Sequence, residues 1–394
     1  MQVLILAAGN GTRLRPITET RPKPLVRVAN TTPLFYNLSQ LPSSIKEIII
    51  VVKPSDKLIP KEVGKVFKGK KVKYVEQKYQ IGTADAIFQA KDFLKDKFLV
   101  LMGDDLYSKK DIQKILNEKT PAMGVKKVKD PWRFGVVEVK GKKVVSLIEK
   151  PKNPKSDLVN SGLYFFDKRI FNYKAKRCQE RGECEITDSI SMMIKKEGVY
   201  FAVVEDWLPI SYSWNLLDAN EFLLEKLPKK ILGKVEKGAT IKGKVYIEKG
   251  TIVKGGSYIE GPVYIGKNCL IGPNCYIRPA TSISDNCHIG NGCEIKNSII
   301  GENSNVPHLS YVGDSIIGDN CNLGAGTIVA NLRHDDANVL SIVKGELLDT
   351  GRRKFGTVIG DNVKTGIGTI IYPGRKIWPG KFTHPGEIVR KDIV

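Results

Sequence analysis

Aliphatic residues recur at a strict spacing of six along the second half of the chain, a period that neither an α-helix nor an ordinary strand produces. The residue two before each of these positions is small almost throughout, and the residue after it is often glycine. This pattern predicts a stack of short identical units, in which the chain turns a corner every six residues and the aliphatic side chains point inward. The positions are Val235, Ile241, Ile247, Val253, Ile259, Ile265, Ile271, Ile277, Ile283, Ile289 and Ile295, then, after slips of one, Ile300, Val306, Val312, Ile317, Leu323 and Val329, and finally Ile359, Thr365, Ile371 and Ile377.

The first part of the chain, up to about residue 225, shows no repeat. Continuous hydrophobic runs over residues 3–6, 48–52 and 98–102 alternate there with helical patterns. Such runs are typical of strands buried on both faces of a parallel sheet. We therefore expect an α/β fold with a mixed, mostly parallel, Rossmann-like sheet, and ligands at the carboxyl ends of its strands.

A chain of 394 residues exceeds what one core usually supports. We expect a first domain over residues 1–227, ending in a helix over 219–227, then a linker over 228–234 and the repeat domain over 235–394. No apolar run approaches the ~20 residues that cross a bilayer, and residue 1 leads straight into a strand pattern without a cleavable signal. The expectation is a cytoplasmic protein without membrane contact.

The seven cysteines do not indicate disulfides, because five lie in the repeat and four of these occupy its small position. Cys269 and Cys287 are 18 residues apart, as are Cys275 and Cys293, which corresponds to one turn of a three-sided coil. No histidine or acid shares their spacing, so we interpret them as stacked core residues rather than metal ligands.

The net charge of +21 would suit a nucleic-acid binder, but the 63 lysines and arginines are spread along the whole chain without a basic tail. Anionic small substrates such as nucleoside triphosphates, sugar phosphates and coenzyme A explain the charge as well. We expect no nucleic-acid partner.

A glycine-containing basic motif follows the first predicted strand, where residues 6–16 read LAAGNGTRLRP and Lys23 follows. Gly9 and Gly11 let backbone N–H groups approach phosphates, and Arg13 and Lys23 can neutralise the charge that develops when pyrophosphate leaves. The spacing differs from that of a Walker loop.

This motif resembles the signature of sugar-1-phosphate nucleotidylyltransferases. Further motifs of that family follow in order at Gln77, Gly82-Thr83-Ala84, Gly103-Asp104, Phe134-Gly135, Glu149-Lys150-Pro151 and Asn160-Ser161-Gly162. The resemblance implies that Gln77 and the Gly82-Thr83 motif face the nucleotide base, that Asp104 holds Mg²⁺, that Gly135, Glu149 and Asn160 bind the sugar, and that Lys150 lies near its phosphate. It also implies in-line attack of a sugar phosphate oxygen on the α-phosphorus, catalysed by positioning and charge neutralisation.

The chain departs from this family at one position. The family has an aromatic-x-Asp-x-Gly stretch whose aspartate, or asparagine, is a second Mg²⁺ ligand, whereas residues 207–211 here read WLPIS. Pro209 therefore stands at the ligand position, and Asp206 would point to the opposite face of a strand. Asp104 alone can hold Mg²⁺ together with waters and substrate phosphates. The alternative is a degenerate, regulatory or scaffolding domain.

A second group of motifs interrupts the repeat, with NVPHLSYVGD over residues 305–314, NLGAGT over 322–327, and then Asn331. It resembles the acetyltransferase half of bacterial bifunctional N-acetylglucosamine-1-phosphate uridylyltransferases and, more closely, their archaeal sugar-1-phosphate counterparts. The resemblance implies a left-handed parallel β-helix. It also implies that His308 is the general base, removing a proton from the amine of glucosamine 1-phosphate as the amine attacks acetyl-CoA.

Other positions match this family one by one. Arg278 and Lys296 match residues that hold the sugar phosphate, Tyr311, Asn322 and Asn331 match acceptor and acetyl contacts, Ala325 lines the coenzyme A groove, and Arg352, Arg353 and Lys354 are candidates for the coenzyme A phosphates. The family's tyrosine and lysine after the last asparagine are absent, and Arg333 is a candidate substitute for the lysine. Residues 332–356 interrupt the ladder and are predicted to form a loop that closes over a neighbouring subunit of a homotrimer.

The sequence thus predicts a bifunctional enzyme that acetylates glucosamine 1-phosphate, or galactosamine 1-phosphate, and transfers UMP or dTMP to a sugar 1-phosphate. Three alternatives remain open at this point: an acetyltransferase with a degenerate first domain, a nucleotidylyltransferase whose repeat serves only oligomerisation, and a non-catalytic assembly subunit. Intact Arg278, Lys296 and His308 argue against the last, because a scaffold has no need of them.

Overall fold

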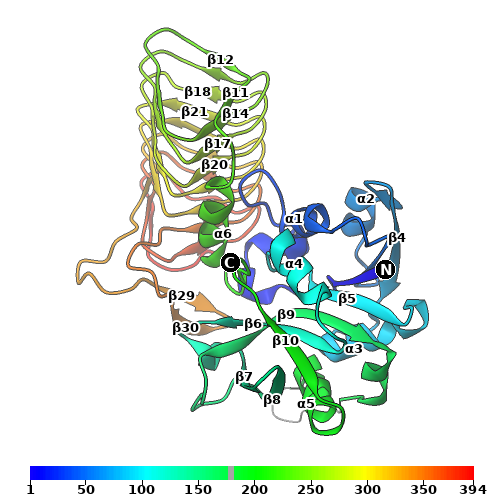
Figure 1. Cartoon of the computed structure of the whole chain (residues 1–394). Helices are drawn as coiled ribbons and strands as arrows, with labels where there is room; N and C mark the ends of the chain where they lie inside the picture. Colours follow the sequence, from blue (N-terminus) through cyan, green and yellow to red (C-terminus); the bar gives the residue numbers. More distant parts are fainter. Residues whose placement is uncertain (176–181) are drawn as a thin grey trace. The chain divides into compact units, whose positions relative to one another are not determined.

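A computed structural model describes residues 1–175 and 182–394 of the chain (Figure 1). By the contacts among its residues the chain divides into two compact units. The first comprises Met1–Asn10, Pro22–Leu25 and Pro33–Pro209, and the second comprises Gly11–Arg21, Val26–Thr32 and Ile210–Val394. Two short N-terminal segments therefore group with the C-terminal half, which sequence inspection did not predict.

The first unit contains one mixed sheet of ten strands, in the order β3-β4-β2-β1-β5-β9-β6-β10-β8-β7. The strands are β1 (Gln2–Leu6), β2 (Glu47–Val52), β3 (Val66–Phe67), β4 (Lys70–Glu76), β5 (Lys97–Met102), β6 (Ala122–Lys127), β7 (Gly135–Lys140), β8 (Lys143–Glu149), β9 (Leu158–Asp167) and β10 (Val199–Val203). Strand β1 pairs in parallel with β2 and β5. The three predicted strands are confirmed, each beginning one residue earlier than expected.

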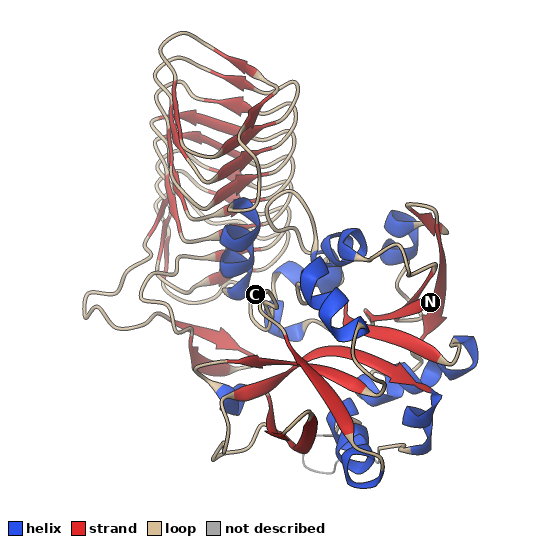
Figure 2. Ribbon diagram, viewed as in Figure 1, coloured by secondary structure: helices blue, strands red, loops and turns tan. Residues whose placement is uncertain are grey.

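Helices cover both faces of this sheet (Figure 2). The helices of this unit are α1 (Pro33–Gln40), α2 (Leu58–Val63), α3 (Thr83–Gln89), α4 (Lys109–Leu116) and α5 (Ile186–Lys196), with 3₁₀ turns η3 (Lys23–Leu25), η4 (Lys91–Phe93), η5 (Pro131–Arg133) and η6 (Lys168–Asn172). Apolar side chains of α1, α2 and α4 pack with Val3 and Ile5, and those of α3 and α5 pack with Leu4 and Leu6. Because successive residues of β1 face opposite sides, both faces are buried, as the continuous hydrophobic run predicted.

The second unit contains a left-handed parallel β-helix whose short strands form three parallel sheets (Figures 1 and 2). The first sheet holds β11 (Lys230–Ile231), β14 (Val245–Ile247), β17 (Val263–Ile265), β20 (Thr281–Ile283), β23 (Ile299–Ile300), β26 (Ile316–Ile317), β31 (Val358–Ile359) and β34 (Lys376–Ile377). The second holds β12 (Lys234–Val235), β15 (Ile252–Val253), β18 (Leu270–Ile271), β21 (His288–Asn291), β24 (Asn305–His308), β27 (Asn322–Leu323) and β32 (Lys364–Thr365). The third holds β13 (Thr240–Lys242), β16 (Tyr258–Glu260), β19 (Tyr276–Ile277), β22 (Glu294–Lys296), β25 (Tyr311–Gly313), β28 (Ile328–Val329), β33 (Ile370–Ile371) and β35 (Ile388–Val389).

The strand register explains the slips in the ladder. Ile265 pairs with Ile283, which pairs with Ile300 and not with residue 301, so one coil is a residue shorter. Ile317 then pairs with Ile359, because the loop over residues 332–356 is inserted between two coils. The rung residue of each coil therefore stacks on the rung residue of the preceding coil, although the corners of the coils differ in length.

The rungs form the core of the β-helix as predicted. They are fully buried from Ile247 to Ile377, with Thr365 the most exposed of them at 6%, whereas Val235 and Ile241 are only partly buried. All five cysteines of the repeat are buried and free, which agrees with their interpretation as core residues. Cys321, two residues before the rung Leu323, also occupies the small position, so five cysteines and not four do so. Cys178 lies outside the described residues.

Further elements of this unit lie outside the coils. They are α6 (Asn215–Leu224), the hairpin of β29 (Leu340–Val343) and β30 (Glu346–Asp349), and the 3₁₀ turns η1 (Thr12–Leu14) and η2 (Ile17–Glu19). Helix α6 begins before the predicted residue 219 and ends before 227. The hairpin lies inside the loop predicted over 332–356.

Candidate active sites

The carboxyl ends of β1 and β5 form the centre of the first candidate site. The N–H of Gly103 donates to the carbonyl of Leu6 over 2.9 Å, which holds the ends of the two strands together. Asp104 follows directly, and its carboxylate forms an ion pair with Lys23. The predicted metal ligand and one predicted catalytic cation are therefore direct neighbours.

Gln77 and Gly82, the residues predicted to face the nucleotide base, are held together by a hydrogen bond. The buried amide of Gln77 donates to the Gly82 carbonyl over 3.0 Å and to the Asp85 carboxylate over 2.9 Å. Gly82 has φ 128°, and a Cβ there would lie 2.3 Å from the carbonyl oxygen of Cys184. Only glycine fits this close approach.

The predicted sugar-binding residues lie on β7, β8 and β9. Gly135 pairs directly with Glu149, and the ammonium of Lys150 lies 3.5 Å from the Glu149 carboxylate. The amide of Asn160 donates to the Tyr164 hydroxyl over 2.6 Å and accepts from the Gly162 N–H. These contacts orient polar groups that can face a sugar.

Glu185 belongs to this region and was missed by sequence reasoning. Its carboxylate accepts the Thr83 hydroxyl over 2.8 Å. Burial, a hydrogen bond with the Glu183 carboxyl and the charge of Glu149 raise the pKa of Glu185 to about 7. Its position directly before α5, in the stretch Glu183-Cys184-Glu185, gave no periodic signal by which it could be found.

Substitution Glu185→Gln should remove a pH dependence of stability. Because the pKa of Glu185 is raised in the folded chain, folding favours the protonated acid, and the free energy of unfolding should fall as pH rises from about 4.5 to about 7. We expect the variant to be more stable than the wild type by about 2 kcal/mol at pH 8 and similar at pH 4.5. Denaturant unfolding at both pH values measures this, with Glu62→Gln on exposed α2 as control. Equal pH dependence in Glu185→Gln and wild type would contradict it.

The segment before Pro209, the position where the family has its second metal ligand, is held by hydrogen bonds of its backbone. The Asp111 carboxylate accepts the N–H groups of Glu205 and Asp206, and Leu106 and Leu208 form an antiparallel bridge. Pro209 is the next residue after this bridge. The described residues contain no group of three or more His, Cys, Asp or Glu side chains suited to a metal ion.

Neighbouring acids do not replace the missing ligand. The Asp105 carboxylate accepts the Trp207 indole N–H over 3.0 Å. Asp206 lies beside Tyr36, whose pKa is raised to about 12 by burial and by the charges of Asp206 and Asp111. Among these acids, the Asp104 carboxylate is therefore the donor that fits the predicted role.

The remaining residues of the first motif straddle the division of the chain. Gly9 belongs to the first unit, whereas Gly11 and Arg13 belong to a segment of the second. Gly11 has a left-handed φ of 65° before η1, and the guanidinium of Arg13 lies 5.9 Å from the ring centre of Tyr212.

The second candidate site is built on the β-helix around Asp314, a buried residue that sequence reasoning did not single out. Its carboxylate accepts from the Lys296 ammonium over 3.1 Å, from the Asn297 amide over 2.7 Å and from the Asn331 amide over 2.5 Å. The Asn331 amide also donates to the Tyr311 hydroxyl over 3.1 Å. Burial raises the pKa of Tyr311, so its hydroxyl stays neutral. The structure thus brings three predicted substrate residues into one network.

Arg278 directly follows β19 of the third sheet and stands two residues after Tyr276, which pairs with Glu294 of β22. Its guanidinium forms a 2.8 Å ion pair with Glu294, and both side chains are partly exposed. Arg278 and Lys296 therefore lie on neighbouring coils, and each forms an ion pair with a carboxylate.

His308 ends β24, where it is exposed and pairs with Asn291 of the preceding coil. Its carbonyl accepts the N–H of Gly326, which places it next to the coil that carries Ala325. Asn322 is exposed on the same coil. Its backbone pairs with Asn305 of β24. His308 is thus accessible at the surface of the β-helix.

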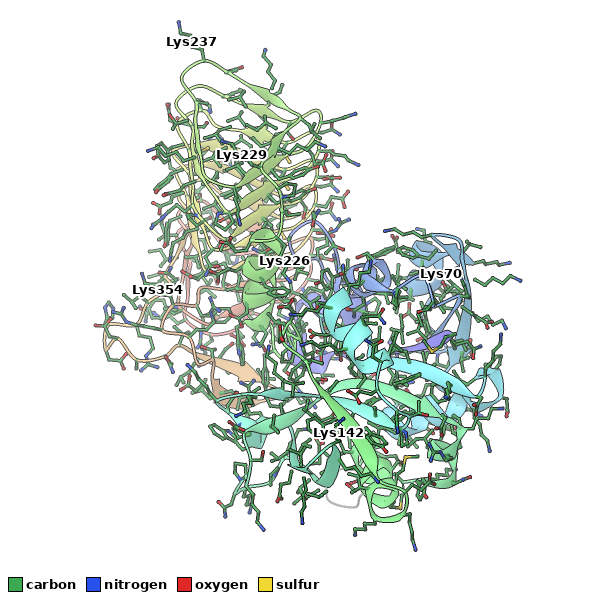
Figure 3. All side chains as sticks on the ribbon, viewed as in Figure 1. Lys70, Lys142, Lys226, Lys229, Lys237 and Lys354 are labelled. Carbon is green, nitrogen blue, oxygen red and sulfur yellow. The ribbon has the colours of Figure 1, made fainter. Side chains whose placement is uncertain are left out.

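The basic run after the hairpin is largely engaged in ion pairs. Arg352 pairs with Asp218 of α6, and Arg353 pairs with Asp336 over 2.5 Å. Lys354 is exposed and is labelled in Figure 3. Of the three candidates for coenzyme A phosphates, Arg353 and Lys354 are thus exposed, and Arg352 is partly buried.

The chain combines an α/β domain built on a mixed sheet with a β-helix that carries the exposed His308. This combination indicates a transferase with two parts. The nucleotidyl transferase family matches residues 2–226, and the GMPPB C-terminal domain family matches residues 259–384. "Bifunctional protein GlmU" of Methanocaldococcus jannaschii is 43% identical over 100% of this chain and 96% of its own length. "Bifunctional sugar-1-phosphate nucleotidylyltransferase/acetyltransferase" of Sulfurisphaera tokodaii is 42% identical over 100% and 98%.

A crystal structure of a putative glucose-1-phosphate thymidylyltransferase from Bacillus anthracis in complex with a sucrose is also similar, with a TM-score of 0.53 and 28% identity over 58% of this chain and 98% of that one. The chain belongs to the nucleotidyl transferase family and, over its whole length, to the family of these bifunctional proteins. This confirms the resemblance stated from the motifs. Across the described ranges 1–175 and 182–394, no helix is long and apolar enough to cross a bilayer.

Proposed function

We propose that the chain is a bifunctional enzyme, which acetylates an amino-sugar 1-phosphate on the β-helix and transfers UMP or dTMP to a sugar 1-phosphate in the first domain. Full-length similarity to bifunctional transferases supports both activities. The observation that carries the proposal is the Asp314 network, which orients Lys296 and Asn331 beside Tyr311. An assembly subunit would not need this network.

In the acetylation step, the phosphate of the amino sugar is held by Arg278 and Lys296. The amine nitrogen attacks the thioester carbonyl of acetyl-CoA, and the His308 ring takes the proton that the amine loses. The C–S bond then breaks, and the coenzyme A thiolate receives a proton. General-base catalysis of this kind contributes ~10²- to 10⁴-fold in rate.

In the nucleotidylyl step, the phosphate oxygen of the sugar 1-phosphate attacks the α-phosphorus of the triphosphate. The bond from the α-phosphorus to the bridging oxygen breaks, and pyrophosphate leaves. Lys23 and Arg13 neutralise its charge, while Gln77 and Glu149 orient base and sugar. The chain forms no covalent intermediate, so catalysis is positioning plus electrostatic stabilisation.

The family implies a magnesium ion, and the Asp104 carboxylate fits it, because Mg²⁺ is often held by one carboxylate together with waters and phosphates. Bound there, Mg²⁺ would neutralise charge on the triphosphate. The Asp104 carboxylate also forms an ion pair with Lys23.

Two assays on one preparation of the full chain test the proposal. Thiol release from acetyl-CoA with glucosamine 1-phosphate or galactosamine 1-phosphate tests the β-helix site. Pyrophosphate release from UTP or dTTP with sugar 1-phosphates and Mg²⁺ tests the first domain. We expect both signals, and absence of either one overturns that half of the proposal.

We also propose that the chain forms a homotrimer through the third sheet of the β-helix. Ile328, Ile370 and Ile388 stack in register on this sheet and are each 40–43% exposed. A column of exposed aliphatic side chains on a rigid sheet favours association with a second copy.

Substitution Ile370→Asp should shift the chain from trimer to monomer, because a buried unpaired carboxylate opposes the contact. Light scattering after size exclusion measures the mass. Ile148→Asp is the matched control, since Ile148 is 49% exposed but lies on β8 of the first unit. A monomeric wild type, or a trimer that survives Ile370→Asp, contradicts the proposed interface.

A further inference from the structure

An acidic column runs along the β-helix beside its first sheet. Asp285, Glu302, Asp319 and Asp361 each lie two residues beyond a rung, and these rungs pair with one another in the first sheet. The column is notable in a chain with a net charge of +21. Four acids stacked on successive coils repel one another unless cations lie close to them.

The three aspartates make the same bond within the coils. The Oδ1 atom of each accepts the backbone N–H at the equivalent position of the preceding coil over 2.8 Å, from Lys267 to Asp285, from Glu302 to Asp319 and from Asp319 to Asp361. One carboxylate oxygen of each aspartate therefore serves to hold neighbouring coils together.

The second oxygens distinguish Asp285 from the other two. The Arg21 guanidinium donates to Oδ2 of Asp319 over 2.8 Å and to Oδ2 of Asp361 over 2.5 Å. The Thr20 hydroxyl donates to the same oxygen of Asp361 over 2.6 Å. In the part of the chain that the structure describes, the Asp285 carboxylate makes only the bond within the coils, through its Oδ1 atom. The ion pairs of Arg21 are largely buried, with 17% of its side chain and 7% of that of Asp361 exposed.

Arg21 ends the segment 11–21 that carries the phosphate-binding motif, and this segment is tied together internally. The Thr18 hydroxyl donates to the Gly11 carbonyl over 2.7 Å, and the Leu14 N–H donates to the same carbonyl over 2.9 Å. Because Thr18 is two residues from Thr20, fixing Thr20 and Arg21 on the coils also restrains Gly11 and the turn that holds Arg13.

The side chain of Arg13 has a second support from the same unit. The Tyr212 ring under its guanidinium is stacked on Trp214, with 4.5 Å between ring centres. Trp214 packs edge-on against the buried Phe355, which follows the β29–β30 hairpin. Arg13 is therefore supported by residues of the C-terminal half at both its backbone and its side chain.

We propose that Asp319 and Asp361 are positioning residues for nucleotidylyl transfer, which they serve by holding Arg21 and Thr20 and thereby the segment 11–21 on the β-helix. This inference rests on the proposed function of the first domain. It means that the β-helix serves the nucleotidylyl reaction as well as its own. The positively charged groups proposed to meet pyrophosphate lie eight residues before and two residues after Arg21.

The test compares Asp361→Asn and Arg21→Gln with the matched control Asp285→Asn in the full chain. An asparagine keeps the Oδ1 acceptor of the coil but loses the charge that meets Arg21. We expect Asp361→Asn and Arg21→Gln to lower kcat for pyrophosphate release by about ten- to a hundredfold with a smaller change in KM for the sugar phosphate. Arg21→Lys should recover part of the loss. Thiol release in all variants, and both activities of Asp285→Asn, should stay within about twofold of wild type.

Amide hydrogen exchange over residues 11–21 gives a readout that does not need activity. Exchange should be faster in Asp361→Asn and Arg21→Gln than in wild type and Asp285→Asn. If exchange and kcat in both Asp361→Asn and Arg21→Gln equal those of the wild type, the inference is overturned. It is also overturned if kcat for pyrophosphate release falls equally in Asp285→Asn. If wild type releases no pyrophosphate, the proposed nucleotidylyl function fails, while exchange still decides whether the anchor exists. If Asp361→Asn does not fold, Arg21→Gln tests the same contact from the other side.

Discussion

Substitution His308→Ala should lower kcat for thiol release from acetyl-CoA by about 10²- to 10⁴-fold, the contribution of a general base. The ring is exposed at the end of β24, so its removal leaves no cavity in the coil. Pyrophosphate release should be unchanged, because the histidine takes no part in that step. Both rates are measured on one preparation with amino-sugar 1-phosphate as acceptor.

His384→Ala is the matched control, since His384 is also exposed on the β-helix but lies outside the acetyltransferase motifs. Its thiol release should equal that of wild type. An unchanged rate in His308→Ala would exclude His308 as the base.

Substitution Asp104→Asn should lower pyrophosphate release by about 10²- to 10³-fold, because it removes the carboxylate that we propose for the metal and that pairs with Lys23. Thiol release should not change, since the Asp314 network is built from other residues. Asp92→Asn, at an exposed site on η4, is the control. A nucleotidylyl rate that survives Asp104→Asn would contradict the assigned role.

Residue 209, where the family has its second metal ligand, allows a gain-of-function experiment. Substitution Pro209→Asp restores that second carboxylate. The Mg²⁺ concentration for half-maximal pyrophosphate release should fall by about tenfold, because a second carboxylate strengthens binding of the cation. If wild type is inactive and Pro209→Asp is active, the first domain is degenerate in this chain. Unchanged Mg²⁺ dependence in an active variant would show that residue 209 does not meet the metal.

The sequence predicted the β-helix in detail because its signal is local and repetitive. Each rung lies six residues from the next within a coil, and the slips at 300 and 317 correspond to coils that are one residue shorter. The strands of the first domain were found for a similar reason, since burial on both faces produces an unbroken hydrophobic run. The domain limits and the roles of individual site residues stay predictions.

Long-range contacts could not be found in this way. Arg21 and Asp361 are 340 residues apart, and neither lies in a pattern that indicates the other. Asp314 stands within a recognised motif, yet its importance depends on a left-handed φ of 51° that buries its carboxylate between Lys296 and Asn331. Glu185 was missed because its pKa is raised above all by burial, which the local sequence does not indicate, and then by the carboxyl groups of Glu183 and Glu149.

The stacked coils of the β-helix contact only the coils above and below, so the stability of this half is a sum of nearest-neighbour terms, as in other solenoids. Opening should then begin at a free end, where Val235 and Ile241 are only partly buried, and advance coil by coil. The coils of β11 to β13 and β14 to β16 must both melt before this fraying reaches Arg278. The first two coils should therefore unfold before the coils that carry the acetyltransferase residues, and these residues stay folded during partial unfolding.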